Sequence, residues 1–161
     1  MYCARWSERP DLGIRVVAGW DHDNDRAAVN CANFGLDLTS NVETLLERRD
    51  IDAVVIASET SMHADLVELA AASGKAIVLQ KPIGLTVDDA DRIVEAVNRS
   101  GVPFTMAWQM RVDPHNLQAK SLLESGGFGR IFMVRRRHCL TTQHMKDFDK
   151  SWHVKPELNR D

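Results

Sequence analysis

The stretch DAVVIASETSMHADLVELAAASGKAIVLQKP, residues 52–82, contains two apolar runs separated by a helical segment. Residues 52–57 are predicted to form a buried strand, and residues 76–79 a second one. Between the two strands, Gly74 is placed to end a helix. The apolar stripe of that helix consists of Leu66, Val67, Leu69, Ala70 and Ala71. A strand, a helix of crossover length and another strand predict two parallel strands of one sheet.

The same alternation continues on both sides of this stretch. Gly35 is placed to end one helix, and Thr86 with Asp89 predicts a capping box at the start of another. The further predicted elements are a strand at 14–20, helices at 23–34, 42–48 and 87–100, and a strand at 102–108. Because crossovers between parallel strands are right-handed, this order predicts an α/β fold with a doubly wound, Rossmann-like parallel sheet covered on both faces.

The pattern changes after Trp108. Asp113-Pro114 predicts the start of a helix that runs to about Leu123. Residues 131–138 alternate in part and carry charge, which is typical of an antiparallel strand with one face in water. We therefore expect an α+β second domain to begin after the parallel sheet.

Composition narrows the class of protein. The 161 residues are 44% hydrophobic and 27% charged, with a net charge of −3, which is ordinary for a globular protein and gives no nucleic-acid signal. No apolar run reaches the roughly 18 residues of a membrane helix, so we expect no membrane partner. Three scattered cysteines, Cys3, Cys31 and Cys139, suit free thiols in a reducing cytoplasm.

Two further groups of basic residues give no clear evidence of a metal site or a nucleic-acid site. His138 and His144 are too isolated from acidic or thiol partners to predict a metal site, so we expect no metal. The basic run 135–137 lacks interleaved aromatic residues. It is therefore interpreted as the solvated face of a strand or an interface rather than as a nucleic-acid patch.

Polar residues follow the predicted strands at their carboxyl ends, where open α/β sheets collect their chemistry. Asp21 follows the strand at 14–20. An acidic residue there hydrogen-bonds the ribose hydroxyls of a dinucleotide and repels a 2′-phosphate, although Asp21 also suits an ordinary turn. Ala57 and Ser58 end the strand at 52–57, where their backbone would line a nucleotide cleft.

Thr60, Ser61 and His63 stand at a predicted helix start. Free backbone amides and the positive end of the helix dipole suit a phosphate or another anion at such a place. Ordinary capping by Thr60 or Ser61, and a hydrogen-bonded histidine in the first turn, are the alternative interpretations.

The polar pair Gln80-Lys81 ends the strand at 76–79 and is followed by Pro82. Proline forbids a continued ladder and keeps Lys81 out of the helical region. A lysine delivered to this edge of the sheet is a candidate reactive group, and an exposed turn lysine is the alternative.

Together, these residues resemble the glucose–fructose oxidoreductase/inositol dehydrogenase (Gfo/Idh/MocA) family of nicotinamide-dependent oxidoreductases. The resemblance covers almost the whole chain in the right order. The matching stretches are residues 16–21 with Arg26-Ala27, residues 52–58 with His63-Ala64, and residues 74–83, 108–111 and 126–131.

The resemblance implies a Rossmann domain, here residues 1–109, joined to a second domain for substrate binding and oligomerisation, here residues 110–161. It implies NAD as cofactor, with NADP as the other possibility, a sugar or polyol substrate and a homo-oligomer in the full-length family. It makes Lys81 the catalytic residue that orients the substrate hydroxyl and helps proton transfer. The cofactor-binding residues that it implies are Asp21, Ala57, Ser58, His63, Gln80, Lys81, Pro82 and Gln109.

Three departures from the family pattern bear on activity. Gln80 stands where the family has glutamate, which removes a charge that would favour protonated Lys81. The first strand and the glycine-rich phosphate loop are absent. The later aspartate and histidine of the second domain are absent as well. We therefore expect a fragment, and a gap of roughly 10 Å in the sheet where the missing strand would pair, since strands lie about 4.8 Å apart.

The sequence thus predicts an NAD(P)-dependent oxidoreductase that transfers a hydride between a nicotinamide and a sugar, polyol or related hydroxylated compound, represented by an incomplete chain. A non-catalytic dinucleotide- or sugar-binding module is the alternative, because Gln80 is neutral and acid–base residues are missing. A third reading is a non-functional remnant.

Overall fold

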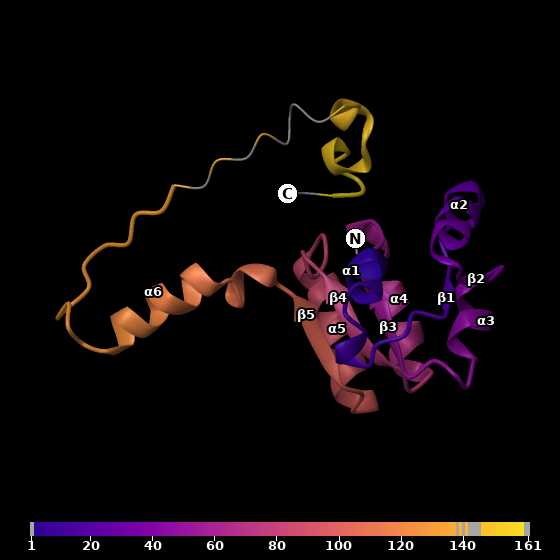
Figure 1. The fold of residues 1–161 in the computed structure, drawn as a ribbon, viewed down its shortest axis with the longest axis horizontal. Coiled ribbons are helices and arrows are strands. Elements are labelled where there is room, and N and C mark those ends of the chain that lie inside the picture. Colours follow the sequence, from indigo (N-terminus) through magenta and orange to yellow (C-terminus); the bar gives the residue numbers. More distant parts are fainter. Residues whose placement is uncertain (1, 138, 140, 142–145, 160–161) are drawn as a thin grey trace.

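A computed structural model describes residues 2–137, 139, 141 and 146–159 of the chain. Its central element is a sheet of three parallel strands in the order β3-β4-β5, made of β3 (Ala53–Ile56), β4 (Ala76–Gln80) and β5 (Phe104–Ala107) (Figure 1). Strand β4 is the middle strand, and its Leu79 is in register with Ile56 on one side and Met106 on the other. The parallel pairing and the α/β fold class predicted from the sequence are confirmed.

Two helices cover one face of this sheet. They are α4 (His63–Ala72) and α5 (Val87–Ser100), which pack against each other because the two crossovers step in the same direction. Val67, Leu79 and Ile93 are completely buried between the helices and the sheet. Along β4, alternate residues are buried and half-buried, so the opposite face is less well covered than the sequence pattern predicts.

A second sheet contains only two short parallel strands, β1 (Ala18–Gly19) and β2 (Asp37–Leu38), with α2 (Asn24–Phe34) and α3 (Val42–Leu46) beside them. The strand predicted at 14–20 is therefore mostly irregular. Among the described strands, β1 pairs with β2 alone and over two residues, so few ladder bonds hold the rest of this segment. Among the described strands none joins β1 to β3, which is where the sequence predicts a gap.

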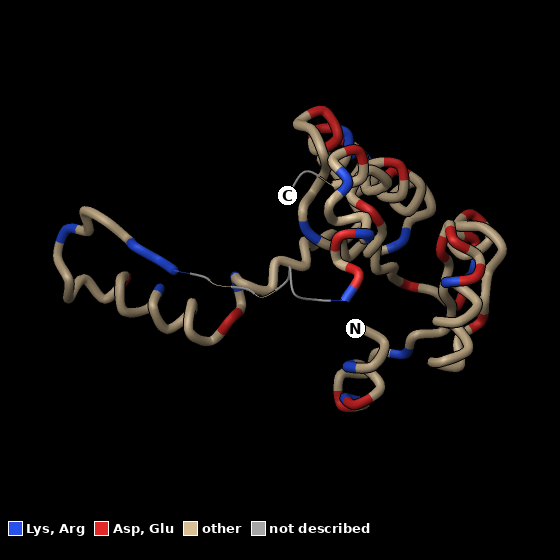
Figure 2. Tube along the Cα trace, turned by 90° about the horizontal axis from the view of Figure 1, so that it is seen from above, with Lys and Arg blue, Asp and Glu red and all other residues tan. Residues whose placement is uncertain are grey.

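The remaining described elements are two α-helices, α1 and α6, and short 3-10 turns. They are α1 (Tyr2–Ser7), η1 (Pro10–Leu12), η2 (Thr60–Met62), η3 (Gln109–Arg111), α6 (Pro114–Glu124), η5 (Phe148–Lys150) and η6 (Trp152–Val154). No helix among the described residues is long and apolar enough to span a membrane. Figure 2 shows basic and acidic positions interspersed over the compact part of the chain.

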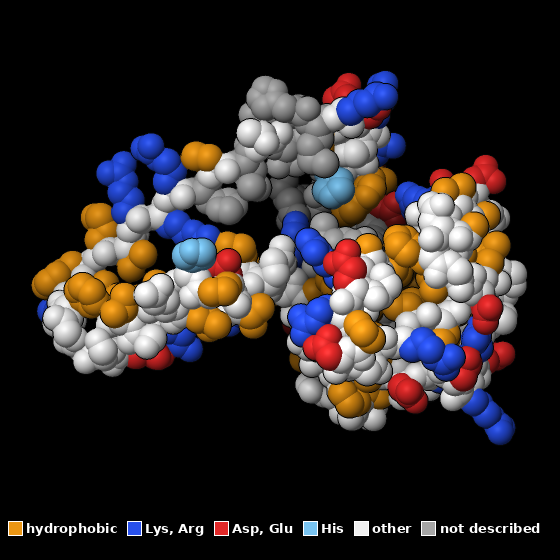
Figure 3. Space-filling model, viewed as in Figure 1, with side chains coloured by type: hydrophobic (Ala, Val, Ile, Leu, Met, Phe, Trp, Pro, Cys, Tyr) orange, Lys and Arg blue, Asp and Glu red, His pale blue; other side chains and the backbone are white. Residues whose placement is uncertain are grey.

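The predicted strand at 131–138 is wrong for residues 131–137, which the structure describes without any strand. His138 lies outside the described residues. Helix α6 leads the chain away from the sheets, and the segment after it turns back without joining them (Figure 1), so no described strand lies alongside to accept its backbone hydrogen bonds. Phe132, Met133 and Val134 are consequently exposed, and apolar side chains gather along this part of the surface (Figure 3).

Polar side chains cap the starts of α2, α3 and α6. Asp23, Asn41 and Asp113 each accept a backbone hydrogen bond at the start of α2, α3 and α6. The prediction that Thr60 or Ser61 caps the next helix is wrong, because a 3-10 turn intervenes and α4 begins after Met62 without a side-chain cap.

Thr86 starts α5 with a complete capping box. Its side chain accepts a hydrogen bond from the Asp89 amide at 3.1 Å, and the Asp89 carboxylate accepts one from the Thr86 amide at 3.1 Å. We expect Thr86→Ala to lower the free energy of unfolding by about 1 kcal/mol, because the Asp89 amide loses its acceptor and the Asp89 carboxylate loses the Thr86 hydroxyl as a donor. Urea unfolding followed by circular dichroism measures this change. Thr105→Ala, at an exposed position of β5, is the control, and an equal loss in both variants would contradict the capping role.

Candidate functional site

The three strands of the central sheet end at the same edge, and polar residues follow two of them. Ala57 and Ser58 follow β3, while Gln80 ends β4 and Lys81 follows it. Since parallel strands present their carboxyl ends together, these side chains come from different segments to one place.

A cavity of about 190 Å³ opens at this edge. Its lining consists of Ala57, Ser58, Gln80, Lys81, Trp152 and His153. Four of these residues are among those predicted from the sequence, and the structure brings them together. The cavity combines apolar walls with a hydroxyl, an amide, an ammonium and an imidazole, which is the character of a small-molecule site.

Trp152 and His153 come from the far end of the chain and were missed in the sequence. Their rings stack with centroids 4.0 Å apart. This segment is held against the start of α4 by a hydrogen bond from Thr60 Oγ1 to Asn159 Oδ1, 3.2 Å long, and by one from the Ser61 amide to the Leu158 carbonyl, 3.3 Å long. No local pattern signals such a return of the chain.

The Gln80-Lys81-Pro82 corner is fixed by the backbone. The Lys81–Pro82 peptide bond is cis. Gln80 Oε1 accepts a hydrogen bond from the Lys81 amide at 3.1 Å, so the glutamine side chain folds back over the corner that carries the lysine. Lys81 itself is exposed at the cavity wall.

His63 lies directly behind this corner and is completely buried. Its Nδ1 is 2.8 Å from the Pro82 carbonyl oxygen, and its Nε2 is 3.3 Å from the Ser58 carbonyl oxygen. A neutral imidazole carries one N–H, and the shorter distance assigns it to Nδ1. The ring therefore donates to the Pro82 carbonyl after β4 and packs against the Ser58 carbonyl after β3, and it does not line the cavity.

Asp21 belongs to a separate polar cluster. Arg26 on α2 donates two hydrogen bonds to the Asp21 carboxylate, Nε to Oδ2 and Nη2 to Oδ1, each 2.6 Å long. The Asp23 amide also donates to Oδ1, at 3.0 Å. Partial burial would raise the pKa of Asp21, but hydrogen bonds from Arg26 and Asp23 outweigh it and lower that pKa. The same ion pair raises the pKa of Arg26, so both groups are charged at neutral pH.

Glu59 joins this cluster from the other sheet, since it follows β3. Its Oε1 is 3.4 Å from Arg26 Nη2, and its Oε2 is 3.5 Å from His22 Nδ1. His22 Nδ1 is also 3.4 Å from Asp21 Oδ1. Gln109, by contrast, is exposed in η3 and does not line the cavity.

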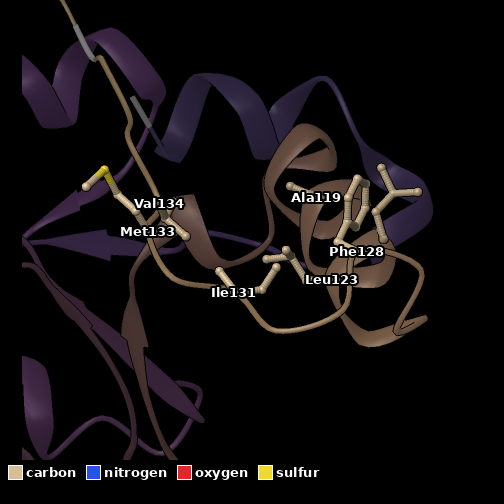
Figure 4. A pocket seen from close by; sticks show the side chains of 7 residues that line it. Ala119, Leu123, Phe128, Ile131, Met133 and Val134 are labelled. Atoms are coloured by element: carbon tan, nitrogen blue, oxygen red, sulfur yellow. The ribbon is translucent and has the colours of Figure 1, made fainter.

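A larger groove of about 330 Å³ lies between α6 and the segment after it and shares no lining residue with the polar cavity. The side chains that line it, among them Leu123, Phe128 and Ile131, are all hydrocarbon or thioether groups (Figure 4). It offers no acid, base or hydrogen-bonding side chain, so the polar cavity is the candidate functional site.

A parallel α/β sheet with a polar cavity at its strand carboxyl ends is the arrangement by which doubly wound α/β proteins, dinucleotide-binding proteins among them, hold their ligands. Residues 1–108 match the family model of the oxidoreductase family with an NAD-binding Rossmann fold. The chain belongs to this Gfo/Idh/MocA oxidoreductase family.

Named relatives support the same family. The chain is 34% identical to inositol 2-dehydrogenase 2 of Saccharopolyspora erythraea over 78% of its own length and 38% of the relative's. It is 35% identical to D-apiose dehydrogenase of Paraburkholderia graminis over 76% of its length and 33% of the relative's. The WlbA dehydrogenase of Bordetella pertussis, solved with NADH and UDP-GlcNAcA, superposes with a TM-score of 0.72 at 25% identity, over 81% of this chain and 38% of that one. The chain thus spans less than two fifths of the length of these relatives.

Proposed function

We propose that this chain carries the nicotinamide- and substrate-facing part of an NAD(P)-dependent dehydrogenase that acts on a sugar or polyol. The observation that carries the proposal is the cavity in which Ser58, Gln80 and Lys81 meet at the ends of two parallel strands. The inositol and apiose dehydrogenases among its relatives support the substrate class.

The residues at the strand ends suit a dinucleotide. Ala57 and Ser58 present backbone beside the cavity, while Asp21 offers a carboxylate at the end of β1 for a ribose hydroxyl. Bound NAD would supply the nicotinamide that accepts a hydride from the substrate carbon. Trp152 and His153 would close the cavity from the side away from the sheet and keep water out.

Lys81 is the proposed catalytic residue. When the substrate alcohol is oxidised, a neutral Lys81 amine accepts the hydroxyl proton as the hydride leaves the carbon. In the opposite direction, its ammonium donates that proton to the carbonyl oxygen. Such proton transfer by a positioned group contributes about 10²- to 10⁴-fold to a rate.

We expect NADH to bind the 161-residue chain, measured as a change in nicotinamide fluorescence. In a chain of the full length of its relatives, turnover of myo-inositol or D-apiose with NAD in excess should fall at least about a hundredfold on Lys81→Met, while the dissociation constant for NADH stays within about threefold. Lys120→Met, an exposed lysine on α6 that pairs with Glu124, is the control and should change neither value. Absence of NADH binding to the wild-type chain would refute the proposal.

A non-catalytic dinucleotide- or sugar-binding module is the second candidate. The observation that favours it is the neutral Gln80, which directs its amide oxygen to the Lys81 backbone and places no charge beside the lysine. NADH binding without turnover of any polyol, in a chain of the full length of its relatives, would select this candidate over the enzyme.

A further inference from the structure

Glu59 is a buried carboxylate that the proposed mechanism does not use. Only 6% of the residue is exposed. Its Oε2 makes no hydrogen bond to any described residue, and His22 Nδ1, 3.5 Å away, does not supply one. A buried charged oxygen without a donor costs free energy, so its retention calls for a functional or structural reason.

The surroundings of Glu59 are those of a ribose-binding site in a dinucleotide fold. Asp21, at the end of β1, has the position that binds the adenosine ribose in such folds, and Arg26 beside it is the kind of residue that would pair with a 2′-phosphate. Glu59 reaches this place from the end of β3 and contacts Arg26. The orphaned Oε2 points to a hydroxyl donor rather than to a phosphate.

The formal charges of the cluster favour the same ligand. Two carboxylates, Asp21 and Glu59, surround one guanidinium, Arg26, which leaves a net charge of −1 when His22 is neutral. Arg26 Nη2 is shared between Asp21 Oδ1 at 2.6 Å and Glu59 Oε1 at 3.4 Å. The guanidinium is therefore neutralised and held by carboxylates, so it is poorly placed to accept a phosphate.

We propose that Glu59 determines cofactor choice by holding Arg26 against Asp21, so that the site accepts the 2′-hydroxyl of NAD and rejects the 2′-phosphate of NADP. This inference rests on the proposed dinucleotide-binding function. Glu59 follows β3, whereas Asp21 follows β1, so cofactor choice would depend on residues from two different strands. The substitution that tests it removes only the charge of Glu59.

The experiment compares NADH and NADPH binding to the wild-type chain, Glu59→Gln, and the double variant Glu59→Gln/Arg26→Gln. Glu59→Gln should lower the ratio of the NADPH to the NADH dissociation constant by about tenfold, because one of the two carboxylates that neutralise Arg26 loses its charge. The double variant should lose this gain. Calorimetry with 5′-AMP and 2′,5′-ADP probes the adenosine end alone. The ratio of the 2′,5′-ADP to the 5′-AMP dissociation constant should change among the three proteins in the same direction as the NADPH to NADH ratio.

Glu68→Gln is the matched control. Glu68 on α4 accepts hydrogen bonds of 3.0 and 2.7 Å from Arg92, so the variant makes the same chemical change to a carboxylate–arginine pair away from the strand ends. It should leave the NADPH to NADH ratio unchanged. Circular dichroism confirms that each variant is folded before binding is compared.

The outcomes separate this inference from the proposed function. An unchanged ratio in Glu59→Gln, or a gain in NADPH affinity that persists in the double variant, overturns the role of Glu59 and leaves the proposed function intact. Failure of the wild-type chain to bind either dinucleotide or either adenosine probe overturns both.

Discussion

Leu79→Ala is expected to lower the free energy of unfolding by about 3–5 kcal/mol, the range for a leucine removed from a closed core. Leu79 is completely buried in the middle strand of the central sheet. It packs in one cluster with Val67 of α4 and Ile93 of α5. A cavity at this point would loosen both helices and both neighbouring strands at once.

The loss is large relative to what a domain of this size can spare. Net stabilities of about 5–15 kcal/mol are usual, so Leu79→Ala should move the urea midpoint strongly or unfold the chain. Leu79→Val, which removes less volume, should remain measurable at about 1 kcal/mol. Leu69→Ala makes the same change on α4 at a side chain that is 38% exposed, and equal losses at positions 69 and 79 would contradict this account of the core.

The elements that the sequence predicts well are those whose signal is local. The apolar runs of β3 and β4, the helical stripe of α4 and the capping box of α5 are each contained within a few neighbouring residues. Their pairing into a parallel sheet follows from the length of the crossovers. Most of the residues that are buried in these elements are apolar ones that the periodicity marks.

The strand predicted at 14–20, and the part of the strand at 131–138 that the structure describes, residues 131–137, were overpredicted for one physical reason. A strand is stable only when another strand accepts its hydrogen bonds, and no sequence pattern within the segment reveals whether such a neighbour exists. Strand β1 has a neighbour over two residues only, and residues 131–137 have none among the described strands.

The residues of the candidate site also differ in whether a local sequence pattern predicts them. Ser58 and Lys81 could be predicted because strand carboxyl ends in an open α/β sheet collect functional groups. Trp152 and His153 could not, since the segment returns through the Thr60–Asn159 hydrogen bond between residues 99 positions apart. Glu59 was missed because its contacts with His22 and Arg26 join separate sheets.

His63→Ala is expected to lower the free energy of unfolding by about 2–4 kcal/mol and to weaken NADH binding at least about tenfold. The buried ring donates to the Pro82 carbonyl at 2.8 Å and lies 3.3 Å from the Ser58 carbonyl, so its removal leaves a cavity and an unpaired Pro82 carbonyl. The corner that carries Lys81 would then lose its hydrogen bond to the start of α4. Urea unfolding and nicotinamide fluorescence measure the two effects separately.

Lys75 provides a matched control at the opposite end of β4. Its Nζ donates to the Arg48 and Ile51 carbonyl oxygens at 2.7 and 2.8 Å, so it too connects two backbone segments. Lys75→Met should cost stability without changing NADH affinity, because it acts at the amino end of the strand. If His63→Ala and Lys75→Met affected NADH binding equally, loss of stability alone would explain the effect. His63 would then have no specific role in positioning Lys81.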